Sequence, residues 1–276
     1  MATQTPDYHL IGLYTRYSSK QHATINQRPS LTSPLQIGWT ARVEAVLEYF
    51  QIPHTRQFIQ LSETKSYSPT GLVPILQCHS LPSTTITDSL AICEFLAESN
   101  PSLPLWPKDR QLRALARSAA AQMHSGFPVL RNNFHTNFLA RYTGNVPIPD
   151  GAAAEIARMF RIWDSARKAT AERLVLLGEV DHGFLFGGFS IADAFFWPIL
   201  WRFRSYGLPL DGAGPDALAW MAKMWSDPVF KTLGDRYYAQ ADDPQTCIAH
   251  YDDIFRDRDD VQYGLFPRDW TFSPSG

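Results

Sequence analysis

Short apolar runs and helix-spaced apolar positions alternate over the first hundred residues. A buried run of four to eight apolar residues predicts a strand, and apolar side chains three and four positions apart predict a helix. A Ser/Pro-containing turn between two such runs predicts a hairpin. The predicted elements are a strand at 9–14, a helix at 39–50, a strand at 58–61, hairpin strands at 73–77 and 84–86, and a helix at 88–98.

After residue 101 the pattern becomes helical. Pro101–Lys108 holds three prolines and predicts a linker, because proline disfavours helix. The predicted helices cover 112–138 with a kink at Pro128, 151–177, 190–206 with a kink at Pro198, 216–226 and 228–239. The tail from 241 to 276 is acidic and aromatic and shows no clear period.

This order of elements predicts an α/β domain followed by an all-helical one. The first covers 1–100 and carries a long loop at 15–38. The second covers 101–240, and a C-terminal tail follows at 241–276. Loops of this length within a compact domain are uncommon and are often functional.

Composition narrows the class of protein. Apolar residues make up 45% of the 276 residues, enough for a sizeable core. The net charge of −2 excludes the electrostatic footprint of a nucleic-acid binder, and no apolar run approaches the length of a bilayer span. The polar N-terminus predicts no secretory signal, so we expect a cytoplasmic protein.

The cysteines predict neither a disulfide framework nor a metal or redox centre. Cys78, Cys93 and Cys247 are far apart and form no Cys-x-x-Cys pair. We expect Cys93 to pack on the apolar side of its helix and Cys78, at a strand end, to be exposed.

Three segments together resemble the soluble glutathione transferase family. They are Ser68–Leu76, with a glycine before Val-Pro and a strand; Asp88–Glu98, with an acid-Ser-x-Ala-Ile helix start; and Phe189–Ala194, with a capping box at Ser190 and Asp193. Leu105-Trp-Pro and Gln122–Phe127 are similar to a bacterial-type subgroup. The resemblance implies a thioredoxin-like N-terminal domain, an all-α C-terminal domain and a homodimer. It also implies glutathione as cosubstrate or cofactor, with no metal and no nucleotide.

Val73 and Pro74 form the first candidate glutathione contact. A cis bond before Pro74 would turn the Val73 amide and carbonyl outward. The resemblance implies that these groups pair with the cysteinyl backbone of glutathione, as an added strand would. The alternative is an ordinary trans proline at a strand entrance.

Asp88 and Ser89 form the second candidate contact, at the start of a helix. Unpaired amides and the helix dipole attract a carboxylate there. The resemblance implies that Ser89 and its amide bind the γ-glutamyl carboxylate, with Asp88 positioning that end. Simple N-capping is the alternative, and both roles are compatible.

Met123, His124, Phe127 and Arg131 are the candidate substrate-pocket residues. The resemblance places their helix across the mouth of the glutathione site. The alternative is that the apolar stripe of Met123, Phe127 and Phe134 belongs to the core, as helix-spaced aromatics usually do. We expect a stripe divided between core and pocket wall.

The residue that activates the thiol is the least determined part of the site. Family members place a Tyr, Ser or Cys just after the first strand, and the subgroup has Ser-Ser-Trp-Ser before an arginine. The corresponding stretch here is Ile37–Arg42, where the positions before Trp39 carry no hydroxyl. The remaining candidates are Ser18, Ser19 and Thr40, then Tyr17, with Ser33 as a hydroxyl returning from the loop.

The resulting functional hypothesis is a glutathione transferase that adds the thiolate to a small hydrophobic electrophile. Addition followed by elimination would make the same site a glutathione-dependent double-bond isomerase. A non-catalytic glutathione-binding regulator or a protein–protein interaction module is the other class, motivated by the altered motif at Ile37–Arg42.

Overall fold

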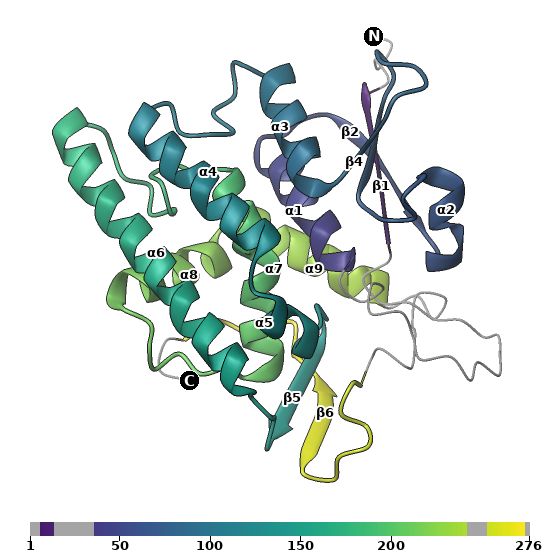
Figure 1. Cartoon of the computed structure of the whole chain (residues 1–276), viewed down its shortest axis with the longest axis vertical. Helices are drawn as coiled ribbons and strands as arrows, with labels where there is room; N and C mark the ends of the chain where they lie inside the picture. Colours follow the sequence, from purple (N-terminus) through teal and green to yellow (C-terminus); the bar gives the residue numbers. More distant parts are fainter. Residues whose placement is uncertain (1–5, 14–35, 242–252, 274–276) are drawn as a thin grey trace.

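The computed structural model describes residues 6–13, 36–241 and 253–273 of the chain. Tyr17, Ser18, Ser19 and Ser33, and most of the loop expected at 15–38, lie outside these described residues, as does Cys247. The described part contains a four-stranded sheet with helices on both sides, followed by a helical region and a separate two-stranded sheet (Figure 1).

The four-stranded sheet has the order β2-β1-β3-β4. Strand β1 (Tyr8–Leu13) pairs in parallel with β2 (His54–Ile59) and antiparallel with β3 (Ile75–Cys78), which pairs antiparallel with β4 (Thr85–Thr87). Helices α1 (Gln36–Tyr49) and α3 (Ser89–Ser99) lie on one side, with the short α2 (Thr64–Tyr67) on the other, after the turn η1 (Leu61–Glu63) (Figure 1). This arrangement confirms the predicted thioredoxin-like fold.

The helical region is organised around α7 (Ile191–Tyr206), all of whose residues are buried. It packs on α1 and on α4 (Arg110–Ser125). The other long helices are α6 (Asp150–Leu177), α8 (Pro215–Ser226) and α9 (Pro228–Ala241). Because α7 contacts elements of both regions, one continuous hydrophobic core joins the sheet region to the helices. In the described ranges, no helix has the length and apolar character needed to cross a membrane.

The predicted kinked helix at 112–138 is two helices instead. Helix α4 ends at Ser125, with Gly126 as its C-cap, and α5 (Pro128–Asn133) begins at the proline. Phe127 between them has φ 59°, in the left-handed region. Pro128 has no backbone N–H and clashes with the preceding turn, so it can begin a helix more easily than continue one. The helical spacing of Phe134 and Phe138 is therefore not a helix face.

The tail contains a strand that the sequence pattern did not reveal. β6 (Val261–Leu265) pairs antiparallel with β5 (Ala140–Gly144), and Tyr142 lies opposite Tyr263. The two rings are 5.5 Å apart. This sheet lies at the opposite end of the helical region from the four-stranded sheet (Figure 1). Each strand is short and its partner is more than one hundred residues away, so no local pattern marks it.

The capping box before α7 is present and fully buried. Asp193 Oδ2 accepts hydrogen bonds from the Ser190 amide and hydroxyl, at 3.0 and 3.1 Å. Asp193 Oδ1 accepts from the Leu185 amide at 2.8 Å and from the Trp220 indole at 2.9 Å. Burial raises the pKa of Asp193 to about 6. One carboxylate thus ties α8 and the preceding loop to the first turn of α7.

Candidate functional site

The register of the β3–β4 hairpin brings the two predicted glutathione motifs to one edge of the sheet. Ile75 lies opposite Thr87 in this antiparallel pair. Val73 is two residues before Ile75, and Ser89 is two residues after Thr87, so both leave the sheet at the same end. The Val73–Pro74 peptide bond is cis, as expected. Val73 and Asp88, which are 15 residues apart in the sequence, therefore lie at the same edge of the sheet.

Asp88 and Ser89 occupy the start of α3. Asp88 is the N-cap, and its Oδ1 accepts hydrogen bonds from the amides of Leu90 at 2.8 Å and Ala91 at 3.2 Å. Asp88 has φ 78°, an uncommon conformation for a residue other than glycine. Ser89 is fully buried, and its hydroxyl has no hydrogen-bond partner among the described residues. The cap is thus complete, while the adjacent Ser89 hydroxyl is left without a described partner.

His124, from the end of α4, reaches this helix start from the helical region. Its Nε2 lies 3.3 Å from Asp88 Oδ2, and its ring packs edge-on against Trp39 with centroids 5.1 Å apart. Burial lowers the pKa of His124, and the nearby Arg42 and Arg131 act in the same direction, against the attraction of Asp88. The imidazole is therefore neutral at pH 7, and it can donate a hydrogen bond to a carboxylate or an incoming ligand.

Three arginines lie close enough to repel one another here, and two of them lie over the Trp39 ring. The guanidinium of Arg42 lies 4.2 Å from the Trp39 ring centroid and 4.7 Å from that of Phe195. Arg131 lies 4.7 Å from the same Trp39 ring and donates to the backbone carbonyls of His124 and Gly126. Its pKa is lowered by burial.

The third arginine is Arg202 of α7, which donates to the carbonyls of Phe134 at 2.7 Å and Pro198 at 3.0 Å. Burial lowers the pKa of Arg202 to about 9 and lowers that of Arg42, with mutual repulsion among the three arginines contributing. Within the described ranges, Arg42 Nε and Nη1 have no hydrogen-bond partner. The local electrostatic potential therefore favours an anion.

Thr40 is the only predicted catalytic hydroxyl within the described ranges, since Tyr17, Ser18 and Ser19 lie outside them. It lies in the first turns of α1 and is almost completely buried. Its hydroxyl has no described partner. Gly12 of β1 lies directly against it, because a Cβ on Gly12 would come within 2.4 Å of Thr40 Cγ2. A catalytic role for any of the four hydroxyls stays a prediction.

The predicted pocket residues divide between core and site. Met123 and Phe127 are fully buried in the main hydrophobic core, as is Phe134. The expected division of this apolar stripe between core and pocket wall was therefore wrong, because all three side chains pack inside. His124 and Arg131 both pack against the ring of Trp39 in the first turns of α1, and His124 also contacts the N-cap of α3. The polar half of the predicted set thus lies beside the candidate glutathione contacts, and the apolar half packs behind it.

The two described cysteines are buried and free. Burial raises the pKa of Cys93, consistent with the packing role expected for it. The expectation that Cys78 is exposed was wrong. Its sulfur donates to Asp7 Oδ2 at 3.0 Å, so the segment before β1 covers it.

Trp39, Arg42 and Arg202 belong to this arrangement, and the sequence did not single them out as site residues. One signal was present: Arg202 interrupts an otherwise apolar run from Phe195 to Phe203, and Arg204 follows it directly. Charged residues in a buried helix need a partner or a function. Trp39 and Arg42 are recognised as site residues only from tertiary contacts, of Trp39 with His124 of α4 and of Arg42 with Phe195 of α7.

The sequence matches two family models, which cover the two parts of the fold. Residues 38–99 match "Glutathione S-transferase, N-terminal domain", and residues 112–223 match "Glutathione S-transferase, C-terminal domain". The order of the two matches agrees with the order of the sheet region and the helical region. The chain belongs to the glutathione transferase family.

Individual relatives match this chain at about 30% identity, and over only part of its length. A probable maleylacetoacetate isomerase of Caenorhabditis elegans is 33% identical over 113 residues, which cover 39% of this chain and 51% of that protein. Glutathione S-transferase 1 of Dianthus caryophyllus is 29% identical over 183 residues, covering 66% of this chain and 69% of the relative. The chain thus spans about half the length of the nematode relative.

Among solved structures, Ure2p in complex with S-hexylglutathione aligns with a TM-score of 0.57 and 19% identity. The alignment covers 84% of this chain and 100% of that one. This likeness supports the fold. Membership of the bacterial-type subgroup stays a prediction.

Proposed function

We propose that this chain binds glutathione at the edge formed by Val73, Asp88 and Ser89 and activates its thiol for reaction with a small hydrophobic electrophile. One observation carries the proposal: the buried hydroxyl of Ser89, without a described partner, lies at the start of α3 on the same edge as Val73. A buried polar group without an internal partner is costly, and a bound carboxylate would satisfy it.

The proposed contacts follow from the chemistry of each group. The Val73 backbone, before the cis bond to Pro74, pairs with the cysteinyl backbone of glutathione in the manner of an added strand. The Ser89 hydroxyl and amide bind the γ-glutamyl carboxylate, where the helix dipole favours negative charge. Asp88, held by its two capping bonds and by His124, positions the charged amino end.

Activation requires the thiolate to be stabilised relative to the thiol. A thiol with a pKa of about 8.5 is only about 3% ionised at pH 7. A pKa about two units lower makes the thiolate dominant and requires about 2.7 kcal/mol of differential stabilisation. One hydroxyl hydrogen bond together with nearby positive charge is of this size. Thr40, Ser18, Ser19 and Tyr17 are the candidate donors, and Arg42 and Arg131 supply the charge.

A glutathione-dependent isomerase is the second candidate function. The observation that favours it is the match to a protein named probable maleylacetoacetate isomerase. In this reaction the thiolate adds to an activated double bond, the resulting single bond rotates, and elimination returns the thiolate and the isomer. Arg42 beside Trp39 would suit a negatively charged substrate, because its Nε and Nη1 have no described hydrogen-bond partner and Asp88 attracts its charge only partly.

A titration of the ultraviolet thiolate band of bound glutathione tests the first step. We expect a thiol pKa at least one unit below that of free glutathione. In the variant Thr40→Val, the pKa should return towards the free value if Thr40 is the donor, and it should be unchanged if the donor lies at Tyr17, Ser18 or Ser19. A bound thiol that titrates normally in the unmodified chain would contradict activation and favour a glutathione-binding regulator.

Product analysis then separates the two reactions. A stable conjugate, with glutathione consumed in proportion, indicates transfer. An isomer formed without net consumption of glutathione indicates isomerisation. A homodimer and a cytoplasmic location stay predictions, and sedimentation velocity of the purified chain tests the first.

A further inference from the structure

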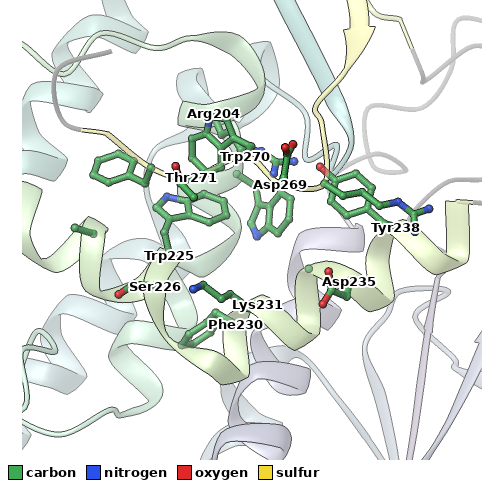
Figure 2. A pocket seen from close by; sticks show the side chains of 15 residues that line it. Arg204, Trp225, Ser226, Phe230, Lys231, Asp235, Tyr238, Asp269, Trp270 and Thr271 are labelled. Atoms are coloured by element: carbon green, nitrogen blue, oxygen red, sulfur yellow. The ribbon is translucent and has the colours of Figure 1, made fainter.

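The C-terminal segment borders a hollow whose lining includes none of Val73, Asp88, Ser89 and His124. Residues 266–273 lie over the ends of α7, α8 and α9 and enclose two adjoining cavities, of about 370 and 620 Å³. Both cavities are lined by Arg204, Trp225, Trp270 and Phe272. Figure 2 shows Trp225 and Trp270 side by side, with Phe230 and Lys231 of α9 across the smaller cavity.

Arg204 is the buried charge of this hollow. Its side chain is only 8% exposed. Its guanidinium carbon lies 4.1 Å from the Trp201 ring centroid, 4.5 Å from Phe266 and 5.3 Å from Trp270. Nη2 donates to the Phe138 carbonyl at 2.6 Å, and Nε has no described partner.

No described carboxylate forms an ion pair with Arg204, and burial lowers its pKa to about 10, against the opposing effect of the Tyr238 side chain. The acidic residues of the smaller cavity, Asp235 and Asp269, are exposed at its rim, as are Lys231 and Arg268. The deep end of the hollow is therefore cationic and aromatic, whereas the mouth carries both signs of charge. A buried guanidinium without a carboxylate is under-compensated, and an anion beside it would be favoured.

We propose that this hollow is a binding site for a planar aromatic carboxylate. The carboxylate would accept charge-assisted hydrogen bonds from Arg204, whose planar fork matches its geometry. The aromatic ring would pack against Trp225 and Trp270, whose centroids are 5.0 Å apart at an interplanar angle of 81°. The cavity volumes suit a ligand of one to three fused rings.

The roof of the site lies outside the two regions that match the family models. This roof, 266–273, lies beyond the last residue that matches a family model, at 223. None of its lining residues belongs to the edge formed by Val73, Asp88 and Ser89. The proposal is therefore independent of the glutathione-binding proposal, and either can fail alone.

Calorimetric titration of the full chain with 1-naphthoate and with neutral 1-naphthylmethanol tests the site. Saturating S-hexylglutathione is present in one series to occupy the glutathione site. We expect naphthoate to bind at least 10-fold more tightly than the alcohol in both series. Equal affinity for the two compounds, or displacement of naphthoate by S-hexylglutathione, would overturn the proposal.

Three variants assign the binding to Arg204. Arg204→Gln should weaken naphthoate at least 10-fold and leave the alcohol within 3-fold. Ala222→Trp fills the smaller cavity from α8 and should weaken the binding of both compounds. This variant tests the site even if Arg204→Gln does not fold. Arg158→Gln is the matched control, because Arg158 also lies over an aromatic ring, Phe127, but outside the hollow. Unchanged naphthoate affinity in folded Arg204→Gln, or equal losses in Arg158→Gln, would contradict the assignment.

Discussion

The Nε2 atom of His124 lies 3.3 Å from Asp88 Oδ2, and this contact joins α4 of the helical region to the N-cap of α3. It places a side chain of the helical region beside the edge at which Val73 and Ser89 meet. Burial and two nearby arginines lower the pKa of His124, whereas the attraction of Asp88 opposes them, so burial of the imidazole favours its neutral form.

Acidification should therefore destabilise the chain in part through His124. A histidine whose folded-state pKa lies below its unfolded value of about 6.5 contributes stability that is present above pH 6.5 and is lost as the pH falls through the folded pKa. We expect the free energy of unfolding to decline less steeply below pH 6.5 in His124→Gln than in the unmodified chain. Urea unfolding at several pH values measures this slope. The exposed His182→Gln is the control, and an equal change in both variants would contradict the interpretation.

Ser89→Ala separates ligand binding from folding. The Ser89 hydroxyl has no described hydrogen-bond partner, so its removal leaves no donor or acceptor unsatisfied. We expect the melting temperature to change by less than about 3 °C, corresponding to under about 1 kcal/mol. The Kd for glutathione, measured by calorimetry, should rise at least 10-fold. Unchanged affinity in a folded variant would remove Ser89 from the proposed site.

Glu44 should make the free energy of unfolding depend on pH in the opposite direction to His124. It is buried in α1, 3.9 Å from Arg56, and burial raises its pKa to about 7. Between about pH 4.5 and 7 the folded state binds more protons than the unfolded state, so this group's contribution is complete below pH 4.5 and is lost as the pH rises through 7.

Glu44→Gln should therefore be more favourable, relative to the unmodified chain, at pH 8 than at pH 5. The difference should reach up to about 3 kcal/mol, from 1.36 kcal/mol per pKa unit. Chemical unfolding at the two pH values measures it, with the exposed Glu98→Gln as control. A difference of zero would show that Glu44 remains ionised throughout.

Asp193→Ala should be among the most destabilising single substitutions in the helical region. The carboxylate accepts from Leu185, Ser190 and Trp220 in a fully buried position. Its loss leaves these donors unsatisfied, and we expect a cost of about 3–5 kcal/mol. Thermal unfolding measures the loss, and the exposed Asp216→Ala should cost less than about 0.5 kcal/mol. A small loss for Asp193→Ala would mean that water replaces the carboxylate.

Local sequence patterns determined the order of most elements and the two parts of the fold. Apolar periodicity and capping signals depend on neighbouring residues alone. The bounds predicted from them for the helices at 39–50, 88–98 and 151–177 are therefore close to the observed ones. Asp88, Ser89 and the Val73–Pro74 pair were found because each motif is contiguous, and the family assignment rested on the same motifs.

Only the tertiary structure decided what depends on contacts between distant segments. The pairing of Tyr142 with Tyr263, the approach of His124 to Asp88 and the enclosure of Arg204 by Trp270 each join residues 36 to 121 positions apart. Spacing along the chain carries no signal for such contacts, because burial and electrostatics at each point are set by residues from other elements. The burial of Met123 and Phe127 in the core, with His124 of the same helix at the site, has the same origin.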